Sequence, residues 1–157
     1  MTYDSKILIE AEFNKNFNQS LNYLKKLGID IGGVFKIWLS TPCIGTGHYI
    51  ENNNISWAFR NDWGNYNTVY LWHEILHSRF IREEYTHALI EFITDEQLRK
   101  HLGGTDYPPF NGHKKLENFK VLALPIWNAY LDSEDHNIID LEDKFKNLYF
   151  NSFATGF

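Results

Sequence analysis

One stretch of the chain, TVYLWHEILHSRF at residues 68–80, constrains the fold more than any other. Its apolar residues recur at the spacing of one face of an amphipathic α-helix: Val69, Trp72, Leu76 and Phe80. We therefore expect a helix over this stretch, and the rest of the fold has to supply the surface against which that face packs. The polar residues HEILH lie inside the same predicted helix.

The first polar feature of this helix is a pair of histidines four residues apart. On a helix, His73 and His77 lie on one face, so both imidazoles can bind a single ion. Glu74 lies about 100° further round, where it can reach a metal-bound water but is poorly placed to be a ligand beside both histidines. Zinc lowers the pKa of a bound water to about 7, and a neighbouring carboxylate can accept its proton. The pattern therefore predicts a zinc site with Glu74 as the general base; the alternative is an ordinary helix that happens to carry two histidines.

A catalytic zinc usually has three protein ligands, so a third must come from another part of the chain. The downstream candidates are Glu83, Glu84, His87, Glu91 and Asp95. Glu83 requires the chain to turn back directly after the helix, and Phe80 stands where a glycine would permit that turn. The stretch THALIEFITDEQL predicts a second helix, on which the last three candidates are four residues apart and share one face.

Within that second helix, Glu91 is surrounded in sequence by apolar residues. A carboxylate that is buried among them needs a partner, and a cation held by the two histidines would be one. Glu84 is the next choice, because a helix that begins earlier would place it on the same face. We expect Glu91 to be the third ligand, with Glu84 as the alternative.

The combination of HEILH with a following helix that carries Glu91 and Asp95 resembles the gluzincin group of zinc metallopeptidases, typified by thermolysin. The resemblance covers residues 68–98, with only 13 residues between His77 and Glu91, a shorter spacer than the thermolysin-type enzymes have. It implies a zincin-like fold, a zinc cofactor and a peptide or protein substrate. It also implies roles for individual residues: zinc ligation by His73, His77 and Glu91, proton transfer by Glu74, and orientation of His73 by Asp95.

Two further parts of the chain are candidates for contact with substrate. The loop DYPPFNGHKK offers Tyr107 and His113 as donors to the oxyanion that forms during peptide hydrolysis. The segment ISWAFR at residues 55–60 is expected to be the edge strand along which an extended peptide adds.

The order of the predicted elements indicates an α+β fold. Helices are expected at 14–27, 68–80, 86–102, 114–132 and 138–150, and strands at 34–39 and 55–60, with a turn-rich loop or hairpin connection between the strands. We expect a single zincin-like domain over residues 1–157, with a small N-terminal sheet followed by a mainly helical part. Its length suits one compact core.

Composition narrows the classes of partner. The net charge is −5 with both signs interspersed, so no basic stripe favours nucleic acid. Cys43 is the only cysteine, which excludes a Cys-rich zinc site. We find neither a secretory signal nor an apolar run of about 18 to 20 residues, so we expect a cytoplasmic protein without membrane contact. The sequence gives no indication of oligomeric state.

Three functions are compatible with these observations. The first is a zinc-dependent hydrolase, most simply a small metallopeptidase. The second is a non-enzymatic regulatory or binding module on a zincin-like scaffold, with a structural or vestigial metal site. The third is a metal-free helical interaction domain.

Overall fold

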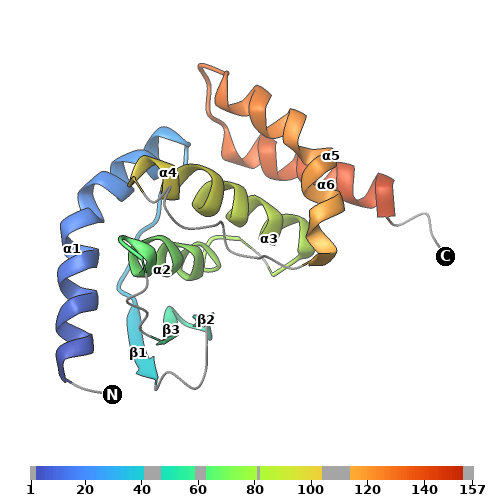
Figure 1. Cartoon of the computed structure of the whole chain (residues 1–157). Coiled ribbons are helices and arrows are strands. Elements are labelled where there is room, and N and C mark those ends of the chain that lie inside the picture. Colours follow the sequence, from blue (N-terminus) through green and yellow to red (C-terminus); the bar gives the residue numbers. More distant parts are fainter. Residues whose placement is uncertain (1–2, 41–46, 59–62, 81, 104–113, 154–157) are drawn as a thin grey trace.

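The computed structural model describes residues 3–40, 47–58, 63–80, 82–103 and 114–153. Within them a long helix comes first, then a small sheet, then a series of helices (Figure 1). The elements are α1 (Tyr3–Lys26), β1 (Lys36–Ser40), β2 (His48–Tyr49), β3 (Asn54–Ala58), α2 (Tyr66–Leu76), α3 (Glu84–Glu91), the π-helical segment η1 (Phe92–Leu98), α4 (Arg99–His101), α5 (Lys114–Leu131) and α6 (Ile138–Phe153). The expected α+β class, with a small sheet and a mainly helical remainder, is confirmed.

Helix α1 is longer than the sequence pattern predicted. It begins at Tyr3 rather than near residue 14, because the added stretch includes several good helix formers and contains neither glycine nor proline. Ile9, within that added part, is buried. The helix ends where expected, ahead of Gly28, whose φ is +66°. A Cβ on Gly28 would lie 2.0 Å from the carbonyl oxygen of His136, so this position requires glycine for its space as well as its backbone angle.

The sheet has three strands in the order β1-β3-β2. β1 pairs with β3 in parallel, from Lys36 opposite Asn54 to Ser40 opposite Ala58, whereas β2 pairs with β3 antiparallel. β3 therefore lies in the centre of the sheet, and the expectation that ISWAFR forms an edge strand is wrong. The edges are β1 and β2, and β2 is a strand of two residues in the stretch that the sequence indicated only as a loop or hairpin connection.

Helix α2, which carries HEILH, is the central element of the fold. Every residue from Tyr66 to Leu76 except Glu74 is buried, so the helix is enclosed rather than amphipathic at a surface. It lies between the sheet on one side and the helix formed by α3 and η1 on the other, and α1 packs along it (Figure 1). The apolar stripe identified in the sequence is only one of its buried faces.

The second helix of the candidate site is continuous from Glu84 to His101 but changes geometry in its middle. Residues Phe92–Leu98 form a π-helix between α3 and α4. The 3.6-residue pattern located this helix within two residues at either end, but it did not predict the widened segment. Seven-residue π-helical segments are rare, and short ones are frequent at functional sites.

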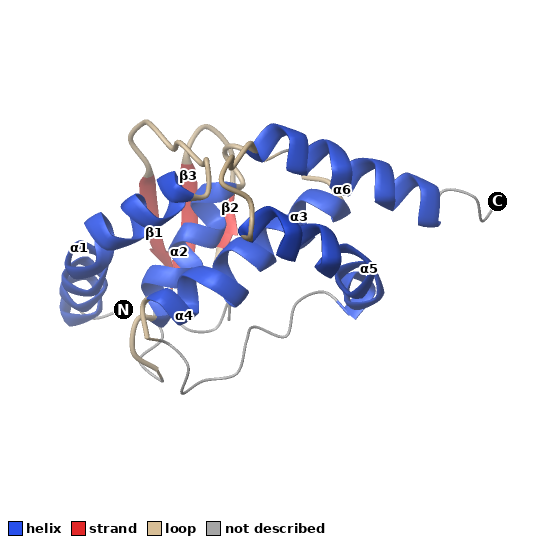
Figure 2. Cartoon of the chain, turned by 90° about the horizontal axis from the view of Figure 1, so that it is seen from above, coloured by secondary structure: helices blue, strands red, loops and turns tan. Residues whose placement is uncertain are grey.

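The last two helices form a hairpin at the end of the molecule opposite α1 and the sheet (Figure 2). α5 and α6 pack on each other and on α3. The far end of α5 returns to α1, where the hydroxyl of Tyr130 donates a hydrogen bond to the carbonyl oxygen of Leu27 at 2.6 Å.

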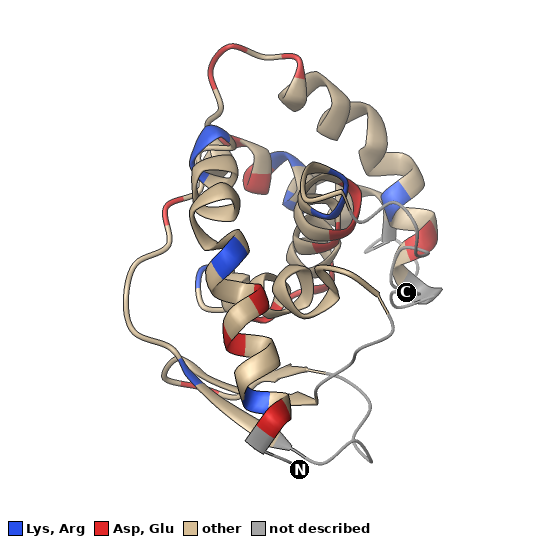
Figure 3. Ribbon diagram, turned by 60° about the vertical axis from the view of Figure 1, so that its left-hand side comes forward, with Lys and Arg blue, Asp and Glu red and all other residues tan. Residues whose placement is uncertain are grey.

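Charged side chains of both signs are distributed over the described residues. Figure 3 shows acidic and basic positions interspersed along the first half of α1, where Lys6 and Glu10 form an ion pair at 3.5 Å. None of the described helices combines the length and the apolar character needed to cross a bilayer.

Candidate metal centre

The helix that carries the histidine pair is anchored at its N-terminus by α1. The carboxylate of Glu12 accepts hydrogen bonds from the backbone N–H of Thr68 at 2.7 Å, from the Thr68 hydroxyl at 3.0 Å and from the side-chain amide of Asn67 at 3.0 Å. Asn16 donates to the side-chain oxygen of Asn65, the residue that precedes α2 and has a φ of 63°. A carboxylate at this end of a helix satisfies a backbone N–H that has no partner within the helix and complements the helix dipole.

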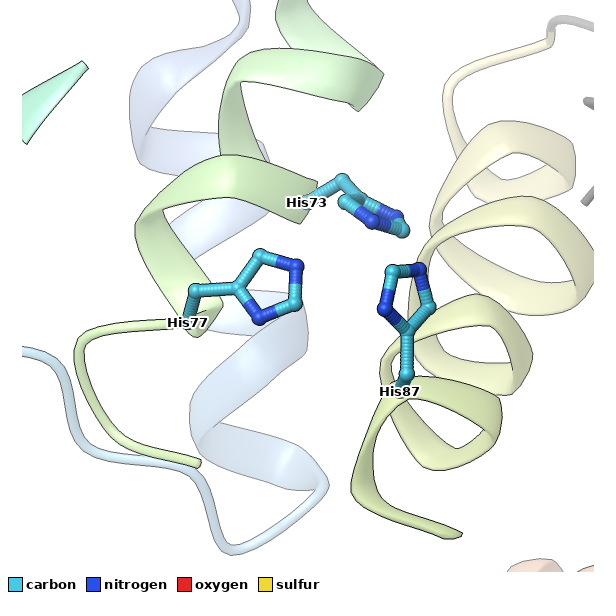
Figure 4. A group of neighbouring side chains, drawn as sticks. All are labelled: His73, His77 and His87. Atoms are coloured by element: carbon cyan, nitrogen blue, oxygen red, sulfur yellow. The ribbon is translucent and has the colours of Figure 1, made fainter. Parts of the chain in front are cut away.

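Three imidazole rings meet between α2 and α3. His73 and His77 project from α2, His87 projects from α3, and the three rings point toward one another (Figure 4). One nitrogen from each lies within 4.8 Å of the other two, and the ring centroids are 5.0 to 5.2 Å apart. His73 is 6% exposed, and the other two rings are half-buried. Neutral imidazole is a preferred ligand of zinc and other divalent transition metals, and three of them around one point can hold such an ion.

Glu91 lies next to His87 and is not one of the three side chains that are grouped closely enough to hold an ion. Its side chain is 1% exposed, with Oε1 at 3.8 Å from Nε2 of His87 and Oε2 at 3.0 Å from the ammonium of Lys120, on α5. Glu91 is therefore buried, and Lys120 gives its carboxylate a cationic partner within the chain. The residue that lies beside the histidine pair is His87, one helical turn before Glu91 on the same face.

Glu84, the alternative third ligand, is directed elsewhere. It is exposed at the start of α3 and accepts a 2.5 Å hydrogen bond from the hydroxyl of Tyr149, on α6. This contact joins α3 to the helical hairpin and does not involve the three imidazoles.

The side chain of Asp95 is buried in η1. Burial raises the pKa of this carboxyl from its ordinary value to about 7, against the opposing effect of a hydrogen bond from Tyr70, on α2. The residue found at Nδ1 of His73 is Thr94, whose hydroxyl oxygen lies 3.4 Å away. Thr94, the neighbour of Asp95, therefore contacts the ring that the family resemblance assigned to Asp95.

Glu74 is the one residue of α2 that is not buried, and it faces the edge strand. Its Oε2 accepts a 2.6 Å hydrogen bond from the backbone N–H of Tyr49 in β2. Burial raises the pKa of Glu74 to about 7, while that hydrogen bond and the positive charge of Arg82 lower it. Arg82 also donates to the carbonyl oxygens of Tyr49 and Ile50, and so fixes β2 beside Glu74.

The backbone approaches Glu74 closely at a second point. A Cβ on Gly47 would lie 2.9 Å from Cγ of Glu74 and 2.5 Å from the ring of Trp57, so only glycine permits this packing. Tyr107 and His113, the candidate oxyanion donors, lie outside the described residues.

Of the residues proposed from sequence, the structure gathers His73 and His77 and places Glu74 on the adjoining face. His87 was one of several candidates, and its spacing from Glu91 was the signal that connected it to the site. Thr94, Tyr49 and Arg82 carried no recognisable sequence signal. Comparison of the chain with protein-family models, with curated proteins and with solved structures finds no match in any of the three.

Proposed function

We propose that this protein is a zinc-dependent hydrolase, most simply a small zincin-like metallopeptidase, whose metal ligands are His73, His77 and His87. The observation that carries the proposal is the convergence of three imidazoles from two helices, with a carboxylate adjacent to the first of them in sequence. Three histidines and one open position are a recognised ligand set for catalytic zinc. When bound, zinc would lower the pKa of a water molecule, so that the water loses a proton readily and becomes a nucleophile for a carbonyl carbon at neutral pH.

Residues of the chain can accept the proton that the attacking water loses. Glu74 lies next to His73 in sequence but on an adjoining face of the helix, so it accepts the proton of the attacking water without being a ligand. Tyr49 N–H holds Oε2 of Glu74, which orients the carboxylate and leaves Oε1 as the acceptor. Glu91 Oε1 lies 3.8 Å from Nε2 of His87, a separation at which the carboxylate would stabilise this ring by charge rather than by a direct hydrogen bond.

An extended peptide is the substrate that suits this arrangement. β2 is the edge strand next to Glu74, and edge strands bind peptides by adding a strand. The N–H and the carbonyl oxygen of Tyr49 are bonded to Glu74 and Arg82, so a peptide that adds here has to displace these contacts. A peptide aligned with this edge would carry its backbone carbonyls past the general base.

The contacts of the edge strand β2 support a second candidate, a non-enzymatic metal-binding module. The N–H of Tyr49 is already bonded to Glu74, and its carbonyl oxygen is bonded to Arg82. In that candidate β2 covers the carboxylate permanently, and the metal serves to join α2 to α3.

The Glu74→Gln variant separates the two candidates. If the protein is a hydrolase, the variant retains the zinc content of the wild type and loses about 10²- to 10⁴-fold in turnover of a library of unstructured fluorogenic peptides. Glu117→Gln, on the exposed side of α5, is the matched control and should leave turnover unchanged. Equal turnover by Glu74→Gln would exclude the proposed mechanism, and full zinc occupancy without turnover in the wild type would favour the binding module.

A further inference from the structure

The hydroxyl of Thr94 lies between a backbone carbonyl and the first histidine of the candidate metal site. It is completely buried in η1. Its Oγ1 is 2.8 Å from the carbonyl oxygen of Ile90, and 3.4 Å from Nδ1 of His73. Thr94 thus contacts a ring nitrogen of His73 from the side of the second helix.

The hydroxyl of Thr94 has two possible acceptors for its one hydrogen, the carbonyl oxygen of Ile90 at 2.8 Å and Nδ1 of His73 at 3.4 Å. A threonine hydroxyl has one hydrogen to donate and two lone pairs that accept. The shorter distance favours donation to Ile90, and the contact with His73 is then one in which Thr94 accepts. That arrangement requires a hydrogen on Nδ1 of His73 and places the lone pair of the neutral ring on Nε2.

From this we infer that Thr94 is a positioning residue, which holds His73 in the Nδ1–H tautomer so that its Nε2 is the nitrogen that binds the metal. The inference rests on the proposed metal site. The family resemblance expected Asp95 to hold this ring, and a neutral hydroxyl does so in this chain.

The size of the effect follows from the behaviour of other outer-sphere partners of metal-binding histidines. Loss of such a partner typically lowers metal affinity by about 10- to 100-fold, because the ring is no longer held in the tautomer and orientation that the metal requires. Thr94→Val removes the hydroxyl while it preserves shape, and Thr94→Ser keeps the hydroxyl.

The test has two measurements on the full chain. Long-range proton–nitrogen NMR of the metal-free protein reports which nitrogen of His73 carries the hydrogen, and competition with a chromophoric chelator gives the zinc affinity. We expect Nδ1–H in the wild type and in Thr94→Ser, and loss of that preference in Thr94→Val, with zinc binding weakened by about 10- to 100-fold.

Ser20→Ala is the matched control. Ser20 is also fully buried, and its hydroxyl donates to the carbonyl four residues earlier, Asn16, but in α1 and away from the histidines. It should leave both the tautomer and the zinc affinity unchanged. A wild type with hydrogen on Nε2 of His73, or a Thr94→Val variant with wild-type tautomer and affinity, would overturn the inference. Failure of the metal site itself would appear separately, as absence of zinc binding by the wild type, and the tautomer measurement would still decide the role of Thr94.

Discussion

At the scale of single residues, the candidate metal site depends on which of two polar side chains one helical turn apart faces the histidine pair. His87 and Glu91 share a face of α3, and the structure directs His87 to the histidine pair and Glu91 to Lys120. Because Glu91 is almost entirely buried, the charge of Lys120 matters more than that of an ordinary surface lysine.

Two lysines of this chain allow that difference to be measured. Lys120→Met removes a cationic partner of buried Glu91 and should lower the free energy of unfolding by about 1–3 kcal/mol. Lys100 makes a contact of the same 3.0 Å length with Glu96, but both side chains are partly exposed, so Lys100→Met should cost little. Urea denaturation of both variants is the measurement. Equal effects would mean that burial does not strengthen the Lys120–Glu91 contact.

At the scale of elements, the orientation of α2 is the property on which the site depends. Its N-terminus is fixed by Glu12, a residue of α1 that is 56 positions away from Thr68 in sequence. Its C-terminal half presents His73 and His77 toward α3, and Glu74 toward β2. The capping contact and the metal site therefore belong to opposite ends of one helix.

Glu12→Gln tests the capping contact. The variant loses the negative charge at the start of α2, and we expect a loss of about 1–2 kcal/mol in the free energy of unfolding. Glu10→Gln, in the same helix, removes only a surface ion pair with Lys6 and should be close to neutral. Thermal unfolding followed by circular dichroism makes the comparison, and a Glu10 variant as unstable as the Glu12 variant would argue against capping as the cause.

At the scale of the whole molecule, Tyr130 joins the end of α5 to the end of α1. Its hydroxyl donates a hydrogen bond to Leu27, directly after α1, and Asp135 and the ring of His136 lie beside it. Burial, followed by the negative charge of Asp135, raises the pKa of Tyr130 to about 12. The neutral phenol is the form that donates to Leu27, so ionisation removes this connection.

The pH dependence of stability follows from the raised pKa of Tyr130. A group whose pKa is higher in the folded than in the unfolded chain stabilises the fold below its unfolded pKa, about 10, and that stabilisation disappears as pH rises toward the folded value. We expect wild type to exceed Tyr130→Phe by about 1 kcal/mol at pH 7 and the difference to decrease above pH 10. Urea midpoints at pH 7, 9 and 11 measure it; a difference that grows with pH would contradict the assignment.

The sequence located what depends on local spacing and missed what depends on tertiary contacts. The 3.6-residue period predicted the helix from Glu84 to His101, and the spacing of HEILH predicted two convergent imidazoles. The choice between His87 and Glu91 depends on how that helix is rotated against α2, which neighbouring residues do not encode. The same holds for β3, whose central position depends on pairing with the two-residue strand β2.

The zinc content of His87→Ala and Glu91→Gln, purified without an affinity tag, tests the proposed ligand set most directly. With His73, His77 and His87 as ligands, the wild type binds about one zinc per chain, His87→Ala loses it at micromolar zinc, and Glu91→Gln retains full stoichiometry with weaker affinity. If His87→Ala retained zinc and Glu91→Gln lost it, the third ligand would be Glu91 and not His87. A wild type without zinc would contradict the proposed site as a whole.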